Sequence, residues 1–204
     1  MMEQLPLEIS AAPQPGFDNY VAGANAEALE RVRELAAGRL SETIVYLWGE
    51  HGSGRSHLLR AAAGVDPALV IADDVEQLDA AGQQRLFLAI NAARDGQAKV
   101  LVAGSRPPAA LVLRDDLRTR LAWGLVYQLK SLSDADKAAH LRSEAARRGL
   151  VLSEELIGYL LSRLPRDFAS LNALLDLLDR HSLARQRPVT LALVREALYG
   201  GRGG

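Results

Sequence analysis

Eight residues from Gly49 to Ser56 have the types and the spacing that bind a phosphate group: Gly-Glu-His-Gly-Ser-Gly-Arg-Ser. They follow residues 43–48, a β-branched and aromatic run that is typical of a strand. Glycines let such a loop wrap closely around an anion, and the amides of the loop and of the next helix point toward it. The pattern predicts a phosphate-binding loop; a glycine-rich turn without a ligand is the alternative for the loop alone. The residues that would contact the ligand are Gly49, Glu50, His51, Gly52, Ser53, Gly54, Arg55, Ser56 and His57.

Arg55 stands at the position where this loop pattern usually carries lysine. A guanidinium is a planar fork and not a point charge, so we expect Arg55 to bind the β- and γ-phosphates more readily than it supports catalysis. Ser56 would offer its hydroxyl to Mg²⁺. The loop is therefore predicted to hold a nucleotide together with a magnesium ion.

Two acids, Asp73 and Asp74, follow the apolar run 68–72, which predicts a buried parallel strand. Ligands of open α/β sheets bind at the carboxyl ends of the strands. Asp73 would hold Mg²⁺, often through water, and Asp74 would polarise the attacking water in an active ATPase. Ser105 ends the next strand and could contact the γ-phosphate or that water. A surface Asp-Asp pair at a strand end is the alternative.

Strands alternate with helices up to about residue 130, which predicts an α/β fold with a parallel sheet and right-handed crossovers. After Lys130 the helical period and the capping residues predict a small all-helical domain. The expected helices are 25–39, 56–63, 80–94, 134–148, 154–163, 168–185 and 191–199, and the strands are 43–48, 68–72, 98–103 and 125–129. The expected caps are Asn25, Ser133, Gly149, Ser153, Asp167 and Thr190.

Composition excludes several classes of protein. The chain has 204 residues and a net charge of −1, which argues against a protein built mainly to grip nucleic acid. It contains no cysteine, so a disulfide framework, a zinc ribbon and a thiol nucleophile are excluded. We find no signal-peptide pattern and no apolar run of membrane-spanning length. These observations predict a soluble cytoplasmic protein without a membrane partner.

The segment 115–124 combines acids with two arginines, Arg118 and Arg120. A solvated surface cluster is the ordinary interpretation of such a segment. The functional interpretation is an arginine supplied to a nucleotide on a neighbouring molecule, where it would neutralise transition-state charge.

Four segments, 17–25, 46–59, 104–108 and 116–124, together resemble the DnaA branch of the AAA+ ATPases, and within it the Hda family of DnaA regulatory inactivators. The resemblance implies a P-loop base domain, 17–130, followed by a helical lid, 131–199, and a short tail, 200–204. It also implies bound ADP or ATP with Mg²⁺, Val21 beside the adenine, and Arg120 as an arginine finger acting in trans.

The leader, residues 1–16, is expected to be extended and to carry a further resemblance. Gln4-Leu-Pro-Leu7 is similar to the sliding-clamp-binding peptide of the same family. Pro6 favours an extended chain, Leu5 and Leu7 could enter an apolar groove, and the Gln4 amide could make directed hydrogen bonds. The implied partners are DnaA and the sliding clamp, with DNA reached only through the clamp and self-association left open.

Three departures from the family pattern affect these expectations. Only residues 64–67 separate the phosphate-loop helix from the next strand, so one edge strand of the sheet is expected to be missing. Ala169 stands where the lid is expected to carry an arginine, and Arg166, three residues earlier, could replace it. No helix-turn-helix domain is expected after the lid.

Two functions follow, and they belong to different classes. The first is a regulator that binds adenine nucleotide and the DNA-loaded clamp and promotes hydrolysis of DnaA-bound ATP, so that the chemistry occurs on the partner. The second is a self-hydrolysing AAA+ ATPase or loader that would use Asp73 and Asp74. A degenerate scaffold that binds no nucleotide is a third, weaker hypothesis. Whether the chain is itself an enzyme is left open.

Overall fold

The computed structural model describes residues 14–163 together with Leu175, and the findings below concern these residues. Residues Pro15–Leu132 form one compact unit, and the described residues from Ser133 onward belong to a second unit. Among the described residues, no helix is both long enough and apolar enough to cross a membrane.

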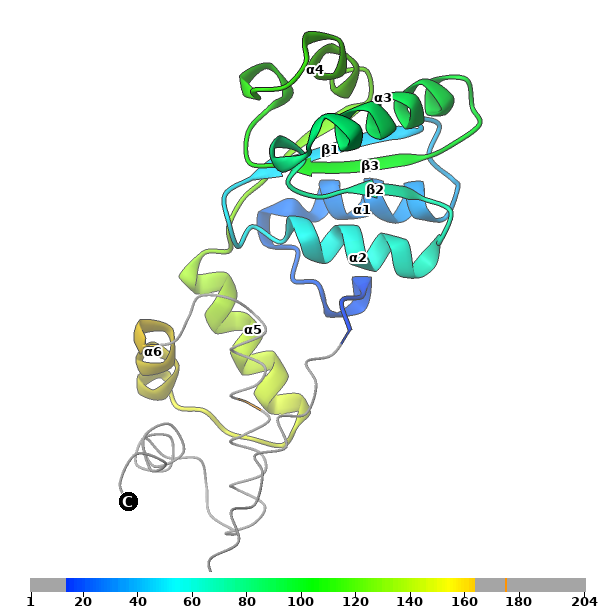
Figure 1. Cartoon of the computed structure of the whole chain (residues 1–204). Coiled ribbons are helices and arrows are strands. Elements are labelled where there is room, and N and C mark those ends of the chain that lie inside the picture. Colours follow the sequence, from blue (N-terminus) through cyan, green and yellow to red (C-terminus); the bar gives the residue numbers. More distant parts are fainter. Residues whose placement is uncertain (1–13, 164–174, 176–204) are drawn as a thin grey trace, which may run out of the picture. The chain divides into compact units, whose positions relative to one another are not determined.

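A four-stranded parallel sheet forms the centre of the first unit, as Figure 1 shows. Its strands are β1 (Ile44–Gly49), β2 (Val70–Ala72), β3 (Val100–Gly104) and β4 (Leu125–Leu129), in the spatial order β2-β3-β1-β4. The predicted α/β class and parallel sheet are confirmed. Because β1 and β3 lie at the centre of the sheet, their side chains are almost all buried.

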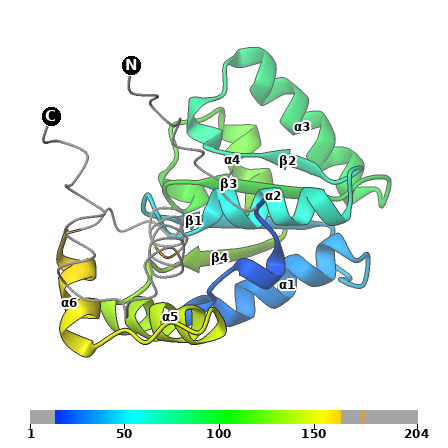
Figure 2. The same ribbon diagram turned by 90° about the horizontal axis from the view of Figure 1, so that it is seen from below.

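Helices cover both faces of the sheet. Helices α1 (Ala26–Ala36) and α2 (Arg55–Val65) lie on one face, and α3 (Ala80–Arg94) and α4 (Asp115–Leu121) lie on the other (Figures 1 and 2). Side chains alternate between the two faces along β1, because successive residues of a strand point to opposite sides. Each face therefore has its own core.

The first core contains Val45 and Leu47 of β1, packed with Leu58 and Leu59 of α2 and with residues of α1. The second contains Ile44 and Tyr46 of β1, packed with residues of α3 and α4 that include Leu86, Ile90, Leu117 and Leu121. The predicted helix 80–94 forms as α3, and it buries Leu86, Ile90 and Ala93.

Strand β2 corrects one expectation. The apolar run 68–72 predicts a buried strand, whereas the expected loss of an edge strand predicts a more exposed one. The structure agrees with the second expectation, because β2 lies at the edge of the sheet and Ile71 is 41% exposed. Its position agrees with the short connection from α2, because a missing neighbouring strand leaves β2 at the edge.

Helix α4 and four short 3-10 helices were not predicted from the sequence. The 3-10 helices are η1 (Phe17–Asn19), η2 (Gly23–Asn25), η3 (Val75–Gln77) and η4 (Pro108–Ala110). Helix α4 has only seven residues and buries only Leu117 and Leu121. A helix of two turns with two apolar positions gives too weak a period to be recognised.

Asn25 precedes α1, but its side chain makes no capping hydrogen bond, which corrects the predicted cap. Instead, its Nδ2 donates to the Lys130 carbonyl at 2.8 Å, and its Oδ1 accepts from the Lys130 amide at 2.8 Å. Asn25 is 3% exposed. Two hydrogen bonds to the same residue satisfy both ends of the buried Asn25 amide, so this tertiary contact replaces the local cap.

The second unit contains α5 (Asp134–Arg147) and α6 (Glu154–Arg163) among the described residues. Ser133 forms the predicted capping box with Asp136, and the Ser153 hydroxyl accepts from the Leu156 amide at 3.2 Å. Gly149 follows α5 with φ +72°, as expected of a residue that ends a helix. The core of this unit consists of Ala138, Leu141, Ala145, Leu150, Leu156, Ile157, Leu160 and Leu175.

Several predictions fall outside the described residues. They are the leader up to residue 13 with Gln4, Leu5, Pro6 and Leu7, the helices 168–185 and 191–199 with their caps Asp167 and Thr190, and Arg166 with Ala169.

Candidate functional site

The phosphate loop follows the carboxyl end of β1, next to the carboxyl end of β3. These two strands are neighbours, yet the helix after β1, α2, covers one face of the sheet, while the helix after β3, α4, covers the other. Adjacent strands whose connections leave in opposite directions open a crevice at their carboxyl ends, where ligands of open α/β sheets bind. The fold therefore places the predicted loop at the expected binding edge.

The loop adopts a conformation that its glycines permit. Gly52 has φ +82° and Gly54 has φ +94°, values that residues with a side chain rarely adopt. A Cβ on Gly54 would stand 2.7 Å from a ring carbon of Tyr20. Ser53 is buried, and its Oγ has no hydrogen-bond partner among the described residues. The loop is thus shaped by backbone conformation and by a close aromatic neighbour.

The segment before α1 packs onto this loop and onto the first turn of α2. The ring of Tyr20 lies 5.4 Å from the ring of His57, and the His57 Nε2 is 2.9 Å from the Gly16 carbonyl oxygen. Burial raises the pKa of Tyr20, against a smaller effect of the Asn25 hydrogen bond. Val21 is partly buried in the same segment. Gly16 to Val21 are therefore held at the loop.

Arg55 is buried and forms an ion pair across the site. Its Nη2 is 3.2 Å from Oδ1 of Asp74, and the Arg55 side chain is only 9% exposed against 44% for Asp74. Asp74 has φ +43°, the only positive φ of a non-glycine residue among the described residues. Aspartate tolerates this left-handed conformation better than most residues. The turn at Asp74 brings its carboxylate to the guanidinium.

The residues present fit a bound phosphate. The Nη1 of Arg55 is buried and has no hydrogen-bond partner among the described residues. An orphaned, charged donor beside a loop of amide groups is where a phosphate oxygen would complete the bonding. Ser56 is partly buried and Asp73 is exposed, and these two could offer oxygens to Mg²⁺, which prefers few protein ligands together with phosphate and water.

Glu76 also belongs to the crevice, although the sequence analysis did not name it. It lies in η3, directly after Asp73 and Asp74, and its Oε1 accepts from the Ser105 amide at 3.0 Å. Burial alone would raise the pKa of Glu76, but hydrogen bonds from Ser105 and the charge of Arg55 outweigh burial and lower the pKa. A glutamate four residues beyond a strand has no distinctive spacing, so only the fold identifies it.

Tyr46 and Gly104 show how closely this part of the site is packed. A Cβ on Gly104 would collide with the Tyr46 hydroxyl and would stand 3.0 Å from Oε2 of Glu76. The Tyr46 hydroxyl donates to the Arg106 carbonyl at 2.7 Å. Burial, and then the charge of Glu76, raise the pKa of Tyr46, so it stays a neutral donor.

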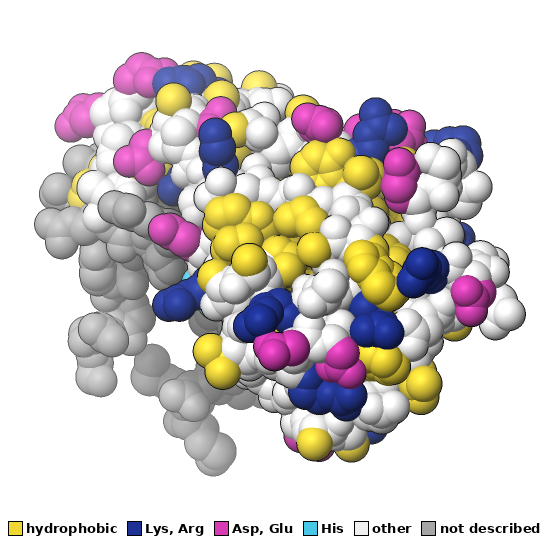
Figure 3. Space-filling model, turned by 90° about the horizontal axis from the view of Figure 1, so that it is seen from above, with side chains coloured by type: hydrophobic (Ala, Val, Ile, Leu, Met, Phe, Trp, Pro, Cys, Tyr) yellow, Lys and Arg dark blue, Asp and Glu magenta, His cyan; other side chains and the backbone are white. Residues whose placement is uncertain are grey.

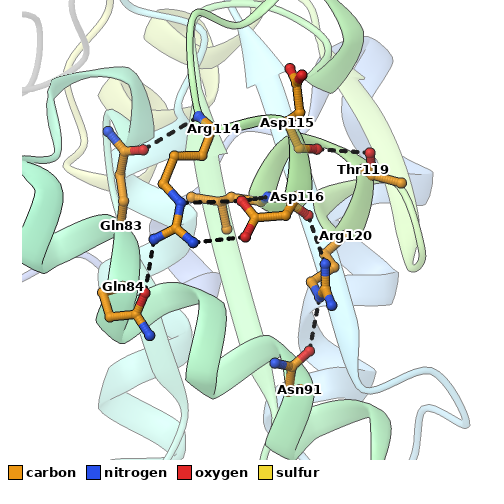
Figure 4. Close-up of polar contacts among 9 residues, drawn as sticks. Gln83, Gln84, Asn91, Arg114, Asp115, Asp116, Thr119 and Arg120 are labelled. Carbon is orange, nitrogen blue, oxygen red and sulfur yellow. Dashed lines mark hydrogen bonds and ion pairs between the residues drawn. The ribbon is translucent and has the colours of Figure 1, made fainter.

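Arg120 lies in a separate cluster on α3 and α4, which Figure 4 shows in part. Its guanidinium carbon is 4.2 Å from the centre of the Phe87 ring and 4.9 Å from that of the Trp123 ring. Its Nε donates to the Asn91 side chain at 2.9 Å, and its Nη1 donates to the Asp116 carbonyl at 3.2 Å. Rings and hydrogen-bond acceptors therefore fix the direction of this guanidinium.

The structure thus brings the phosphate loop, Asp74, Glu76 and Ser105 together and keeps Arg120 apart from them. Trp123, which contacts Arg120, lines a depression of ≈ 400 Å³ together with Thr43 and Ile44 at the start of β1. The phosphate loop follows the other end of β1. Six strand residues span roughly 16 Å, so the two groups lie at opposite ends of the strand.

Comparisons with known proteins agree with this geometry. Residues 134–198 match the family described as "Hda, lid domain". An uncharacterised protein of Haemophilus influenzae is 32% identical over 232 residues, which cover 97% of this chain and 99% of that protein. The chain belongs to the Hda-like family of the DnaA branch of AAA+ proteins. The Haemophilus alignment is at least 28 positions longer than this chain (232 − 204), so this member of the family lacks residues that its relative has.

Solved structures show the same fold. Domain III of DnaA from Thermotoga maritima has a TM-score of 0.71 and 19% identity, covering 92% of this chain and 97% of that one. The replication initiator DnaA bound to AMPPCP and single-stranded DNA has a TM-score of 0.69 and 19% identity, covering 86% and 69%. The α/β base with a helical lid is thus an AAA+ fold. The lid match and the DnaA-like fold associate this Hda-like chain with DnaA-related regulation of replication.

Proposed function

We propose that this protein restrains the initiation of replication by promoting hydrolysis of the ATP that DnaA holds. It binds an adenine nucleotide, ADP or ATP, at the β1–β3 crevice, with Mg²⁺ at Ser56 and Asp73, and it presents Arg120 to the nucleotide of DnaA. Gln4, Leu5, Pro6 and Leu7 would dock on the DNA-loaded sliding clamp. The reaction occurs on the partner, so turnover by this chain is not required.

The observation that carries this proposal is the position of Arg120 at the opposite end of β1 from the phosphate loop. A guanidinium separated from its own loop by the length of the strand, roughly 16 Å, cannot neutralise charge on a phosphate held there. If Arg120 acts on a nucleotide, that nucleotide must belong to another molecule. An arginine supplied in trans accelerates phosphoryl transfer by neutralising charge on the transferring phosphate.

Nucleotide binding is supported by the crevice and by the likeness to a DnaA solved with AMPPCP. The left-handed glycines Gly52 and Gly54 and the buried, unpartnered Nη1 of Arg55 describe a cradle for an anion. When bound, the nucleotide would supply the phosphates that complete this bonding. The chain's own residues bind and orient it: the loop amides face the phosphates, Arg55 offers its free Nη1, and the segment around Val21 would lie beside the base.

The face around Arg120 has the composition of a protein interface. Figure 3 shows hydrophobic side chains gathered on the α3–α4 face, with basic and acidic side chains around them. Leu88 on α3 is 57% exposed, Trp123 is 42% exposed, and Val112 before α4 is 94% exposed. Exposed apolar and aromatic side chains together with arginines are typical of contact surfaces. This supports a protein partner for the cluster that holds Arg120.

The decisive experiment measures hydrolysis of DnaA-bound ATP in the presence of clamp-loaded DNA. We expect Arg120→Ala to reduce the stimulated rate by at least about hundredfold, given the size of arginine contributions in trans. Arg118→Ala is the matched control. It removes the same charge from the same helix, and Arg118 forms an ion pair with the exposed side chain of Asp115 at 2.8 Å.

Normal stimulation by a folded Arg120→Ala variant would contradict the finger assignment. Equal losses in both arginine variants would show that total charge, and not Arg120, supports the reaction. Nucleotide uptake and thermal unfolding of each variant separate these outcomes from loss of fold. Deleting residues 1–9 should abolish clamp-dependent stimulation while leaving nucleotide uptake unchanged.

Asp73 and Asp74, which follow β2, support one alternative function, a self-hydrolysing ATPase. Its weakness is that the Asp74 carboxylate already pairs with Arg55 at 3.2 Å, where it can hardly orient an attacking water. An ATPase assay on the purified chain decides. ATP turnover that is unaffected by DnaA and the clamp, and that is lost in Asp74→Asn, would favour the alternative.

The proposed replacement of the lid arginine by Arg166 is tested separately, by measuring nucleotide uptake of Arg166→Ala.

A further inference from the structure

One side of α3 carries three residues that lie against Arg120 or against the ring beside it. Phe87, Asn91 and Arg94 are spaced at i, i+4 and i+7, so they share one side of the helix. Phe87 and Asn91 contact Arg120 directly, as described above. Arg94 contacts Trp123 instead, with its guanidinium carbon 4.5 Å from the centre of the indole ring. The third residue of the row is therefore linked to Arg120 through an indole.

The backbone of Trp123 is fixed more firmly than its side chain. Its amide donates to the Arg120 carbonyl at 3.0 Å. A Cβ on the next residue, Gly124, would collide with the Ile44 carbonyl oxygen, so glycine lets the chain pass this close to the start of β1. The Trp123 side chain is exposed, and the described residues give its N–H no hydrogen bond. The direction of the ring therefore depends on the groups stacked against it.

Open space lies beside this ring. Trp123 and Arg94 both line the depression of ≈ 400 Å³ at the start of β1. An exposed ring without a hydrogen bond can turn into such a space and leave Arg120. A guanidinium stacked on the indole opposes that movement, because the negative face of the ring attracts the cation. Arg94 also stands in the last turn of α3, where the helix dipole favours a positive charge.

The two rings beside Arg120 are not equally secured. Phe87 is partly buried and packs against the core between the sheet and α3, so that core holds its ring. Trp123 lacks this support. Arg94 is exposed, and no other described residue forms a hydrogen bond or an ion pair with its guanidinium. The contact with Trp123 is therefore what Arg94 contributes to this cluster.

We propose that Arg94 is a positioning residue for Arg120: by stacking on Trp123, it keeps the indole in place beside the arginine finger. The inference rests on the proposed function and deepens it, because it assigns part of the stimulated rate on DnaA to a residue one side chain removed from the finger. A cation that is already oriented stabilises developing charge without reorganising during the reaction.

The first test measures hydrolysis of DnaA-bound ATP, with clamp-loaded DNA and increasing amounts of the full-length chain. Arg94→Ala should lower the rate at saturation by about threefold to fivefold, the loss expected of one exposed cation–π contact. The half-saturating concentration should stay within about twofold of wild type, because Arg94 orients the finger and does not bind DnaA. Arg85→Ala removes the same charge from an exposed position of α3 and should alter neither value. A rate of Arg94→Ala equal to that of wild type would overturn the inference.

A double-mutant cycle separates action through the ring from direct action. Trp123→Leu removes the indole, so adding Arg94→Ala to Trp123→Leu should cause no further loss of rate. If the two losses multiplied, Arg94 would act independently of Trp123, and the inference would be wrong. A change in the half-saturating concentration alone would make Arg94 a contact residue for DnaA, which also contradicts a positioning role.

Fluorescence of Trp123 tests the contact without any activity on DnaA. The chain has two tryptophans, so Trp48→Phe leaves Trp123 as the sole indole. In that background Arg94→Ala should raise the constant for quenching by acrylamide by about twofold, because the ring loses its stacked cation. Arg85→Ala should leave the constant unchanged, and thermal unfolding shows that each variant is folded.

An unchanged quenching constant in folded Arg94→Ala would overturn the inference and leave the proposed function standing. Failure of wild type to stimulate hydrolysis on DnaA would overturn both.

Discussion

Two arginines lie at opposite ends of β1, and different forces hold them. Arg55 is buried, pairs with a carboxylate and keeps one unpartnered donor, so it is arranged to retain an anion inside the molecule. Arg120 is held between two aromatic rings and bonded to neutral oxygens, beside exposed apolar side chains. Its direct hydrogen bonds go to neutral oxygens and not to a carboxylate, which suits a cation that is presented to another molecule.

The largest expected effect is a loss of nucleotide binding when the backbone of the loop at the Arg55 end of β1 is changed. Gly54→Ala forces a Cβ onto φ +94° and toward the Tyr20 ring, so the loop must distort. We expect nucleotide binding to weaken by about hundredfold, equivalent to ~2.7 kcal/mol and within the usual cost of such backbone strain. Gly64→Ala, where a Cβ on α2 would meet nothing within 4 Å, is the control and should bind normally. Calorimetry measures both, and equal binding would contradict this account of the loop.

Two asparagines extend the comparison to stability. Asn25→Ala should lower the free energy of unfolding by about 2–3 kcal/mol, because it removes two hydrogen bonds and leaves the Lys130 amide and carbonyl without them. Asn91→Ala removes one hydrogen bond to Arg120 on a partly exposed helix, and it should lower the free energy of unfolding by less than about 1 kcal/mol. Urea denaturation measures the difference. A larger loss in Asn91→Ala would contradict the conclusion that the two buried Asn25 hydrogen bonds contribute more to stability than the Asn91 hydrogen bond does.

Substituting lysine for Arg55 or Arg120 tests whether each site requires the planar guanidinium group. Arg55→Lys should keep nucleotide binding within about threefold, since a point charge also serves a phosphate in such a loop. Arg120→Lys should reduce stimulated hydrolysis on DnaA by at least about tenfold, because an ammonium group stacks poorly between rings and cannot reproduce the forked bonding. Arg118→Lys is the control for the second measurement. Normal stimulation by Arg120→Lys would mean that charge alone is sufficient.

The smallest effect concerns Asp116 and pH. The hydrogen bonds from Arg114 are the main cause that lowers the pKa of Asp116. A carboxyl group with a lowered pKa stabilises the fold fully above its ordinary pKa, about 3.9, and loses that contribution as the pH falls through the lowered value. Asp116→Asn should therefore be slightly less stable than wild type at pH 7, and the two should converge as the pH falls through the lowered pKa of Asp116. Thermal unfolding at several pH values tests this, and a difference that persists at low pH would contradict it.

The sequence predicted most elements of the base because their patterns are local. The bounds expected for α3 and β4, 80–94 and 125–129, agree with the structure, and Ser133 and Ser153 cap their helices as predicted. The errors have tertiary causes. The buried strand expected at 68–72 proved to be an edge strand, and Asn25 bonds to Lys130 and not to its own helix. Periodicity and capping report on a segment's own shape and not on its neighbours.

The sequence by itself determined the conformation of the proposed phosphate loop, since Gly52 and Gly54 permit the left-handed backbone found there. Only the tertiary structure decided which groups meet there. The contact between Glu76 and Ser105 joins residues 29 apart, and that between Asn25 and Lys130 joins residues 105 apart. Such contacts depend on the order of the strands and on the face that each helix covers. Spacing along the chain does not encode either of these, because both are settled by burying all the apolar faces at once.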